Sequence, residues 1–207
     1  MSNRRTHYFY LVTYIITVAT LYYITNRLSF SFSSLTAAQA LISGLGVSYI
    51  VREITERYLW KYTIIRRILG IDIPYIEGRW EGHIKSSFSD YDEEHKIAIE
   101  IFQTLDSVVI HYYDENAHSY SLMAGFASEH EGGPVKLYAI YQNVPHRADY
   151  KGLNMHNGAM ELKIRPQIKE ISGVYYNNPR ERETHGQLLV EFVGSEKYEG
   201  LHSEEQD

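Results

Sequence analysis

Two long uncharged runs set the first third of the chain apart from the rest. The first covers residues 8–25 and the second covers residues 35–51. A helix needs about 20 predominantly apolar residues to cross the hydrocarbon core of a bilayer, and about 18 is the working threshold. Threonine can bond back to its own helix and tyrosine suits the membrane interface, so both fit such a span. The pattern predicts a hairpin of two transmembrane helices joined by a short loop.

The basic residues around these runs predict the orientation of the hairpin. Arg4 and Arg5 precede the first run, and Arg27 alone lies in the loop. Five basic residues follow the second run: Arg52, Arg57, Lys61, Arg66 and Arg67. Because Lys and Arg are enriched on the cytoplasmic side, both termini are expected in the cytoplasm. A cleaved signal peptide is the alternative for the first run, but residues 22–24 do not resemble its small-residue cleavage site.

Small residues recur at every fourth position of the second run. Ala40, Gly44 and Ser48 would therefore lie on one face of a helix. Small residues at this spacing let two helices approach closely in lipid. We expect this face to mediate helix association, either within one chain or between chains.

An apolar stripe continues beyond the second run. Its members, spaced three or four residues apart, are Ile54, Tyr58, Tyr62, Ile65 and Leu69. This spacing predicts one helix over residues 52–69 that continues into the cytoplasm and ends before Gly70 and Pro74. Its basic side chains would suit anionic lipid head groups.

From residue 75 onward, short runs alternate with segments rich in turn residues. Eight runs are candidate strands: 78–86, 95–104, 107–113, 119–127, 135–142, 157–165, 170–177 and 186–193. Eight short strands at this spacing are typical of an antiparallel barrel or sandwich. We expect a small eight-stranded antiparallel β-barrel over residues 73–207, behind a helical unit over residues 1–72.

Alternation along the first candidate strand predicts which side chains face inward. Trp80, Gly82 and Ile84 share one face, and Arg79 lies with the polar residues on the other. The large Trp80 ring is therefore expected inside the barrel near one end. An eight-stranded barrel leaves room for packed side chains or one small ligand.

Charge divides the chain at the same boundary. Residues 1–72 hold eight Lys or Arg and three acidic residues, a net charge of +5. Residues 73–207 hold twelve basic and 23 acidic residues, a net charge of −11. The acidic barrel argues against a general nucleic-acid binder, which needs a basic surface. The chain has no cysteine, which excludes disulfides and thiolate metal sites.

The sequence offers little catalytic chemistry. Ten histidines are scattered without a close pair such as His-x-x-x-His, so we expect no metal site and no cofactor. Glycine-rich phosphate loops and nucleophile-elbow motifs are absent, so we expect no enzymatic activity. One segment, 177–186, places Arg180 and Arg182 in the acidic domain, although a charged hairpin turn would have the same composition.

Several segments, in their order along the chain, resemble those of a known family. The two predicted spans are followed by EGRWEG (77–82), IFQ (101–103), SYS (119–121), LYAIY (137–141), GVYYN (173–177) and RETHG (182–186). In this order they resemble the two-transmembrane, β-strand-rich effectors associated with bacterial CD-NTases in the anti-phage system called CBASS. The resemblance covers essentially the whole chain.

The resemblance implies a function. In that family a phage-activated cyclase makes a cyclic dinucleotide and the cytoplasmic barrel binds it. The protein then oligomerises and disrupts the inner membrane, so that the infected cell dies. For this chain the resemblance implies four partners: a cyclic dinucleotide, inner-membrane lipids, further copies of the chain and a CD-NTase cyclase. It also implies a two-span protein of the bacterial inner membrane.

Such a ligand presents two bases and two phosphates. Bases stack on aromatic faces, and phosphates prefer the planar donor fork of arginine. The candidate stacking or wall residues are Trp80, Tyr141, Tyr175 and Tyr176. Arg180 and Arg182 are candidates for the phosphates, with Thr184 as a hydroxyl donor, and Gln103 and Asn177 for the base edges.

Two other classes of function remain open. A membrane-tethered barrel could bind a lipid or fatty acid, but this would require an aliphatic lumen, and the candidate lumen is rich in tyrosine. The barrel could also be a ligand-free structural partner in a membrane complex. Binding measurements with a nucleotide panel would separate these functions.

Overall fold

The protein is described by a computed structural model of the full chain. The structure describes residues 4–27, 34–128, 134–146, 155–178, 183–198 and 200–201. Contacts divide the chain into two compact units, Met1–Asp72 and Ile73–Asp207.

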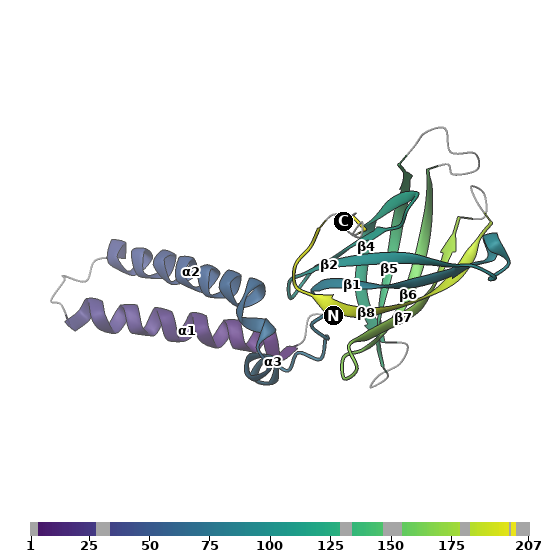
Figure 1. The fold of residues 1–207 in the computed structure, drawn as a ribbon. Helices are drawn as coiled ribbons and strands as arrows, with labels where there is room; N and C mark the ends of the chain where they lie inside the picture. Colours follow the sequence, from purple (N-terminus) through teal and green to yellow (C-terminus); the bar gives the residue numbers. More distant parts are fainter. Residues whose placement is uncertain are drawn as a thin grey trace, which may run out of the picture. The chain divides into compact units, whose positions relative to one another are not determined.

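The N-terminal unit begins with an antiparallel helix pair, α1 (Arg4–Arg27) and α2 (Ser34–Arg57), which is drawn in purple and blue in Figure 1. Gly44 of α2 is buried, and a Cβ placed there would lie 2.6 Å from Val18 Cγ2 of α1. Gly44 therefore contacts α1 of the same chain. Ser48 is half-buried, and the side chain of Ala40 lies outside the described residues.

The two predicted spans are thus present as helices. Within the described part of the chain, no helix has the length and apolarity that a membrane crossing requires. Insertion of this helix pair into a bilayer stays a prediction.

The predicted single helix over 52–69 is wrong. After α2 ends at Arg57, a 3-10 turn (η1, Leu59–Lys61) precedes a separate short helix, α3 (Thr63–Leu69). Tyr62 is extended at the start of α3 and Trp60 is fully buried. On a continuous helix Trp60 would lie about 200° around the axis from Tyr58, on the face opposite the apolar stripe. The break therefore lets the indole be buried while Tyr58 stays exposed.

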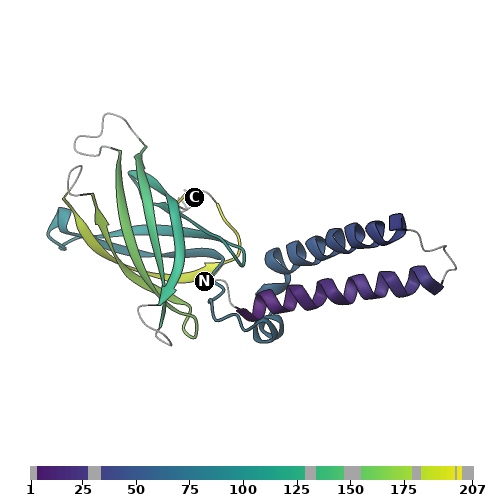
Figure 2. The same ribbon diagram turned by 180° about the vertical axis from the view of Figure 1, so that it is seen from behind.

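The second unit is a closed antiparallel barrel in which each strand pairs with the next and β8 pairs with β1 (Figures 1 and 2). The first four strands are β1 (Gly78–Ser86), β2 (Glu94–Gln103), β3 (Val108–Tyr113) and β4 (Ala117–Ser128). The last four are β5 (Val135–Pro145), β6 (His156–Arg165), β7 (Glu170–Asn177) and β8 (His185–Gly194). A short 3-10 helix, η2 (Ser87–Ser89), lies between β1 and β2. The predicted eight-stranded barrel is confirmed.

One end of the barrel, which we call the floor, is closed around Trp80. The Trp80 ring is 3% exposed and meets the Phe192 ring edge-on at a centroid distance of 5.2 Å. Its indole N–H donates to the carbonyl of Ile76 at 3.0 Å. Gln103 accepts from the Ile76 N–H and donates to the carbonyl of Pro74. The prediction that Trp80 lies inside the barrel near one end is confirmed.

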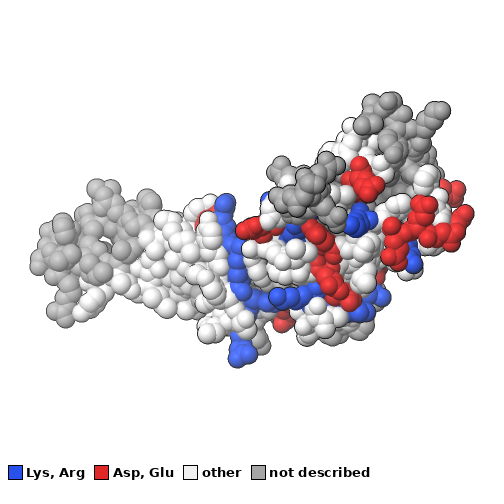
Figure 3. All heavy atoms as spheres, viewed as in Figure 1, with Lys and Arg blue, Asp and Glu red and all other residues white. Residues whose placement is uncertain are grey.

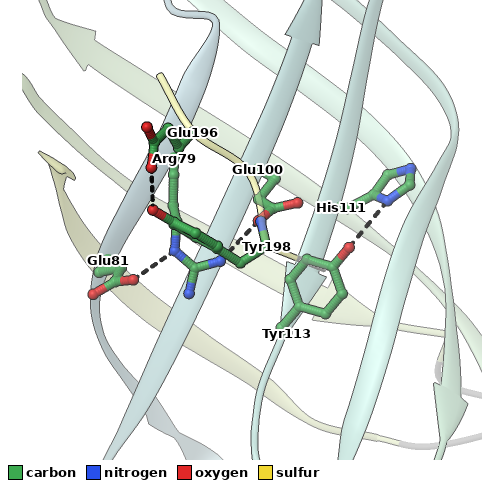
Figure 4. A network of polar contacts seen from close by, with 7 residues as sticks. All are labelled: Arg79, Glu81, Glu100, His111, Tyr113, Glu196 and Tyr198. Atoms are coloured by element: carbon green, nitrogen blue, oxygen red, sulfur yellow. Dashed lines mark hydrogen bonds and ion pairs between the residues drawn. The ribbon is translucent and has the colours of Figure 1, made fainter. Parts of the chain in front are cut away.

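A short segment near the C-terminus covers part of the outside of the barrel. The chain after β8, residues 195–198, passes over outward-facing side chains of β1 and β2, and we call it the C-terminal strap. The strap buries an ion pair in which Arg79 Nη1 donates to Glu100 Oε1 at 2.8 Å (Figure 4). The Tyr198 backbone N–H donates to the same oxygen at 2.5 Å, and the Tyr198 ring lies 5.4 Å from the Arg79 guanidinium carbon.

Candidate ligand-binding site at the barrel mouth

The barrel end opposite the floor holds a cavity. We call this end the mouth; it is the end at which β1, β3, β5 and β7 finish and β2, β4, β6 and β8 begin. The cavity measures about 310 Å³, which is near the small end of the roughly 300–1,000 Å³ range of ligand pockets. All eight strands contribute to its lining, from β1 to β8: Ile84, His95, Tyr112, Ser119, Tyr141, Met160, Tyr175 and Leu188.

Two tyrosine rings in the wall each lie against a glycine of the neighbouring strand. Tyr141 of β5 is opposite Gly158 of β6, and Tyr175 of β7 is opposite Gly186 of β8. A Cβ at either glycine would lie 2.4 Å from the tyrosine ring. Because real side chains do not approach this closely, only glycine at these two positions leaves room for the tyrosine rings in the wall.

Hydrogen bonds hold the same rings at the mouth. Tyr141 donates from its hydroxyl to Asn177 Oδ1 at 2.8 Å, and Asn177 Nδ2 donates to Thr184 Oγ1 at 2.5 Å. The Tyr175 hydroxyl donates to Ser86 Oγ at 2.8 Å. Asn177 and Thr184 are also joined through their backbones at 2.9 Å, which closes the stem of the β7–β8 connection. The aromatic faces are therefore positioned before any ligand binds.

A row of polar side chains crosses four strands beside the tyrosines. Tyr112, Ser119, Asn143 and His156 occupy paired positions on β3, β4, β5 and β6. All four residues are buried and line the cavity. Asn143 Oδ1 is buried and has no hydrogen-bond partner among the described residues. An unpaired buried acceptor costs free energy, so this atom is a candidate for contact with a ligand.

Burial sets the protonation state of the two most enclosed phenols. Burial raises the pKa of Tyr112 well above its ordinary value, and the nearby Asp114 carboxylate raises it further. Burial also raises the pKa of Tyr141, with a smaller contribution from Tyr175. Both phenols are therefore neutral at physiological pH. Asp114 itself accepts from the backbone N–H groups of Asn116 and Ala117, each at 2.8 Å.

The charges around the mouth are mainly acidic. Asp114 and Glu115 line the cavity, and no Lys or Arg does so in the described part of the chain. Acidic side chains also gather at the β1–β2 connection (Figure 3), where Asp90, Asp92, Glu93 and Glu94 are exposed. The cavity therefore suits a neutral, aromatic ligand group better than an anion.

The structure brings four of the predicted ligand residues together at the mouth. Tyr141, Tyr175, Asn177 and Thr184 all line the cavity. Arg180 and Arg182, the phosphate candidates, lie outside the described residues. They belong to the connection whose stem is closed by Asn177 and Thr184.

Three other predicted residues lie elsewhere. Trp80 and Gln103 are at the floor, where their polar groups bond to the backbone of Pro74 and Ile76. Tyr176 is 53% exposed and points outward from β7. Because adjacent strand residues face opposite sides, Tyr175 and Tyr176 cannot both face the lumen.

Three residues that line the cavity were not among the ligand residues predicted from the sequence: Tyr112, Asn143 and His156. The candidate strands end at 142 and begin at 157, which leaves Asn143 and His156 in a turn. The alternation of inward and outward positions could have indicated Asn143, because this residue continues the inward positions of Tyr141 and Ala139. Extending each strand by one residue places both side chains inside.

A second depression lies on the outer face of β1, β6, β7 and β8. It measures about 510 Å³ and contains Lys85 and Lys163 but no Phe, Tyr or Trp among its described lining residues. Lys85 is paired with Glu94 at 3.0 Å. With the His83 imidazole as its one ring among the described residues, this depression is a poorer site for a nucleobase than the mouth. No group of three His, Asp or Glu side chains that could hold a metal ion occurs within the described ranges.

Comparison with known proteins agrees with this geometry. Residues 71–191 match the family model of the Cap15 cyclic dinucleotide receptor domain, which covers more than half of the chain and nearly the whole barrel. A search of curated proteins finds no match. The matched residues include all of β1 to β7, so the residues lining the mouth cavity, together with Trp80 and Gln103 of the floor, lie within the receptor domain. The chain therefore belongs to the Cap15 cyclic dinucleotide receptor family of CBASS effectors.

Proposed function

We propose that the chain is a membrane-anchored CBASS effector whose mouth cavity binds a cyclic dinucleotide. Binding then drives the chain to oligomerise and to disrupt the bacterial inner membrane, which kills the infected cell. The observation that carries the proposal is the pair of pre-positioned tyrosine rings in the mouth cavity of a receptor barrel. A CD-NTase cyclase would supply the ligand.

The mouth offers the contacts that such a ligand requires. Tyr141 and Tyr175 provide ring faces for stacking, which is worth about 1–3 kcal/mol per base in single-strand binders. Thr184 and Asn177 provide polar groups at the stem of the β7–β8 connection. Arg180 and Arg182 in that connection would bind the phosphates with charge-assisted hydrogen bonds. A lipid or fatty acid fits less well, because the cavity wall carries buried Asn143, His156 and Ser119.

The helix pair would insert the effector into the membrane. Apolar side chains such as Leu11, Ile15 and Ile16 of α1 and Leu45 and Ile50 of α2 are exposed. Exposed apolar surface of this kind marks membrane or protein contact, and both helices present it among their described side chains. The bias of basic residues supports a topology with both termini in the cytoplasm.

The topology can be tested with reporter fusions at Ser2 and Asp207. Both reporters should read cytoplasmic in a bacterial host. A periplasmic signal from the C-terminal fusion would contradict the hairpin and the cytosolic receptor together.

Ligand binding can be tested by calorimetry on the full-length chain in detergent. Cyclic dinucleotides should bind, and Arg182→Ala should weaken binding roughly ten- to a hundred-fold, because it removes a charge-assisted hydrogen bond. Arg165→Ala is the matched control, because Arg165 is an exposed arginine paired with Glu170. Equal affinity of wild type and Arg182→Ala would remove Arg182 from the site. Saturable binding of a fatty acid, with no binding of any cyclic dinucleotide, would overturn the proposed function.

A further inference from the structure

The cavity at the mouth is too small to enclose a whole cyclic dinucleotide. Its volume of about 310 Å³ is near the lower limit of ligand pockets, and the ligand consists of two bases, two riboses and two phosphates. Only part of the ligand can therefore enter the barrel.

The charges decide which part enters. Asp114 and Glu115 line the cavity, and within the described ranges no lining residue is a Lys or Arg. A phosphate would be repelled there, whereas a neutral base would meet the rings of Tyr141 and Tyr175. The phosphates would remain at the rim, outside the lumen.

The polar row provides the means to distinguish one base from another. Asn143 is 9% exposed and pairs across the sheet with Ser119 on one side and His156 on the other. Its Oδ1 has no partner among the described residues. A side-chain amide carries an acceptor next to donors, and it pairs with a base edge that offers an amino group beside a ring-nitrogen acceptor, as adenine does.

A base edge with two adjacent donors, as in guanine, is less well matched to the Asn143 amide. The Watson–Crick edge of guanine presents two adjacent donors beside its O6 acceptor, and a free carboxylate meets both donors whereas the acceptor oxygen of an amide faces one of them. Asp114 is a carboxylate that lines the same cavity, but its Oδ1 already accepts two backbone N–H groups. Tyr112 also bonds to the Asp114 carboxylate.

We propose that one base of the ligand enters the barrel lumen between these walls and that Asn143 reads its edge, favouring an amino-bearing base such as adenine. This inference rests on the proposed function. It adds the orientation of the ligand, with one base inside and the phosphates at the rim, and it identifies the residue that determines specificity.

The test compares cyclic di-AMP, cyclic di-GMP and cyclic di-UMP on the full-length chain by calorimetry. Wild type should prefer cyclic di-AMP by roughly ten- to a hundred-fold, the discrimination typical of one bidentate amide–base pair. Asn143→Leu, of similar size, should reduce this preference to within about threefold, because the amide is lost while the apolar walls remain. Gln142→Leu is the matched control, because Gln142 precedes Asn143 on β5 and bonds to Tyr120 and Asn157 on the outer face. It should keep the wild-type preference.

Thermal unfolding checks that each variant is folded. If Asn143→Leu does not fold, Asn143→Ser provides the same comparison, because serine is polar but cannot form the paired contact. An unchanged preference in the Asn143 variants would overturn this inference and leave the proposed function intact, as would a wild-type preference for cyclic di-GMP or cyclic di-UMP. Failure of wild type to bind any of the three would instead overturn the proposed function, and the inference with it.

Discussion

Gly158 and Tyr141 act as a pair in the barrel wall. Gly158→Ala would place a Cβ 2.4 Å from the Tyr141 ring and 2.7 Å from the Tyr176 carbonyl. The ring must move, so we expect a loss of about 1–3 kcal/mol of unfolding free energy together with weaker ligand binding. Denaturant unfolding and calorimetry would measure both. Gly125→Ala on β4 is the control, because no heavy atom lies within 4 Å of a Cβ at Gly125. Equal stability of the two variants would show that Tyr141 does not depend on this space.

The buried phenols predict a loss of stability at high pH. Burial raises the pKa of Tyr141 in the folded state, whereas the unfolded chain has the ordinary value of about 10. Above pH 10 the folded state therefore holds more protons than the unfolded state, so the unfolding free energy falls as pH rises. One such residue contributes a slope of at most about 1.4 kcal/mol per pH unit. Urea unfolding of the full chain between pH 9 and 12 should show a shallower fall for Tyr141→Phe than for wild type. Identical slopes would contradict this.

At the scale of elements, the strands were predictable because short runs of strand-forming residues alternate with segments rich in turn residues. Strand β1 shows this most clearly, since the predicted range 78–86 is the observed one. The helical connector was not predictable in the same way. Its stripe at Ile54, Tyr58 and Tyr62 fitted a helix, but the burial of Trp60 determined the local fold. A periodic pattern does not reveal which single large side chain will be buried.

The C-terminal strap was also beyond prediction from the sequence. Arg79 lies on the polar face of β1, where alternation indicates solvent exposure, yet the strap leaves it 1% exposed. Residues 195–198 carry no periodic pattern that could reveal the contact. A segment that returns from the end of the chain is detected only in three dimensions.

The buried ion pair under the strap predicts that loss of the Glu100 carboxylate lowers the unfolding free energy strongly. Glu100→Ala removes the acceptor of both Arg79 Nη1 and the Tyr198 N–H, and the buried Arg79 keeps only the more exposed Glu81 carboxylate, which it contacts through Nε. Breaking such a pair costs about 3–5 kcal/mol, whereas an exposed pair is worth about 0–1 kcal/mol. Glu170→Ala is the control, because its partner Arg165 is 58% exposed. Denaturant unfolding of the full chain should show a large loss for Glu100→Ala and a small one for Glu170→Ala. Losses of equal size would show that the strap does not isolate the pair from water.

For the whole molecule, the sequence predicted a helical front and a barrel behind it. The candidate site was only partly predictable. Tyr141, Tyr175 and Asn177 follow from strand alternation once the barrel is assumed, because all three fall on inward positions. The sequence does not reveal which end of the barrel is open. The predicted ligand site therefore combined Trp80 and Gln103 of the floor with residues of the mouth. The closing of the floor depends on the contact of Trp80 with Phe192, more than a hundred residues away.

Close packing of α1 on α2 at Gly44 is expected to serve the proposed membrane disruption. Gly44→Leu keeps α2 apolar but places side-chain atoms where a Cβ alone would lie 2.6 Å from Val18 Cγ2 of α1. The two helices must then separate, because close packing of helices in lipid depends on small residues at the contact. Gly46→Leu is the matched control two residues away, because no heavy atom lies within 4 Å of a Cβ at Gly46.

We expect cells that carry Gly44→Leu to survive activation of the pathway and cells that carry Gly46→Leu to die as wild type does. The full-length Gly44→Leu chain in detergent should still bind cyclic dinucleotide with wild-type affinity, because the mouth belongs to the other unit. Survival counts and calorimetry provide the two measurements. If Gly44→Leu cells die as fast as wild type, close packing of α1 on α2 plays no part in the damage. If Gly44→Leu also abolishes ligand binding, the helix pair is required for binding itself, and the division of roles between anchor and receptor is wrong.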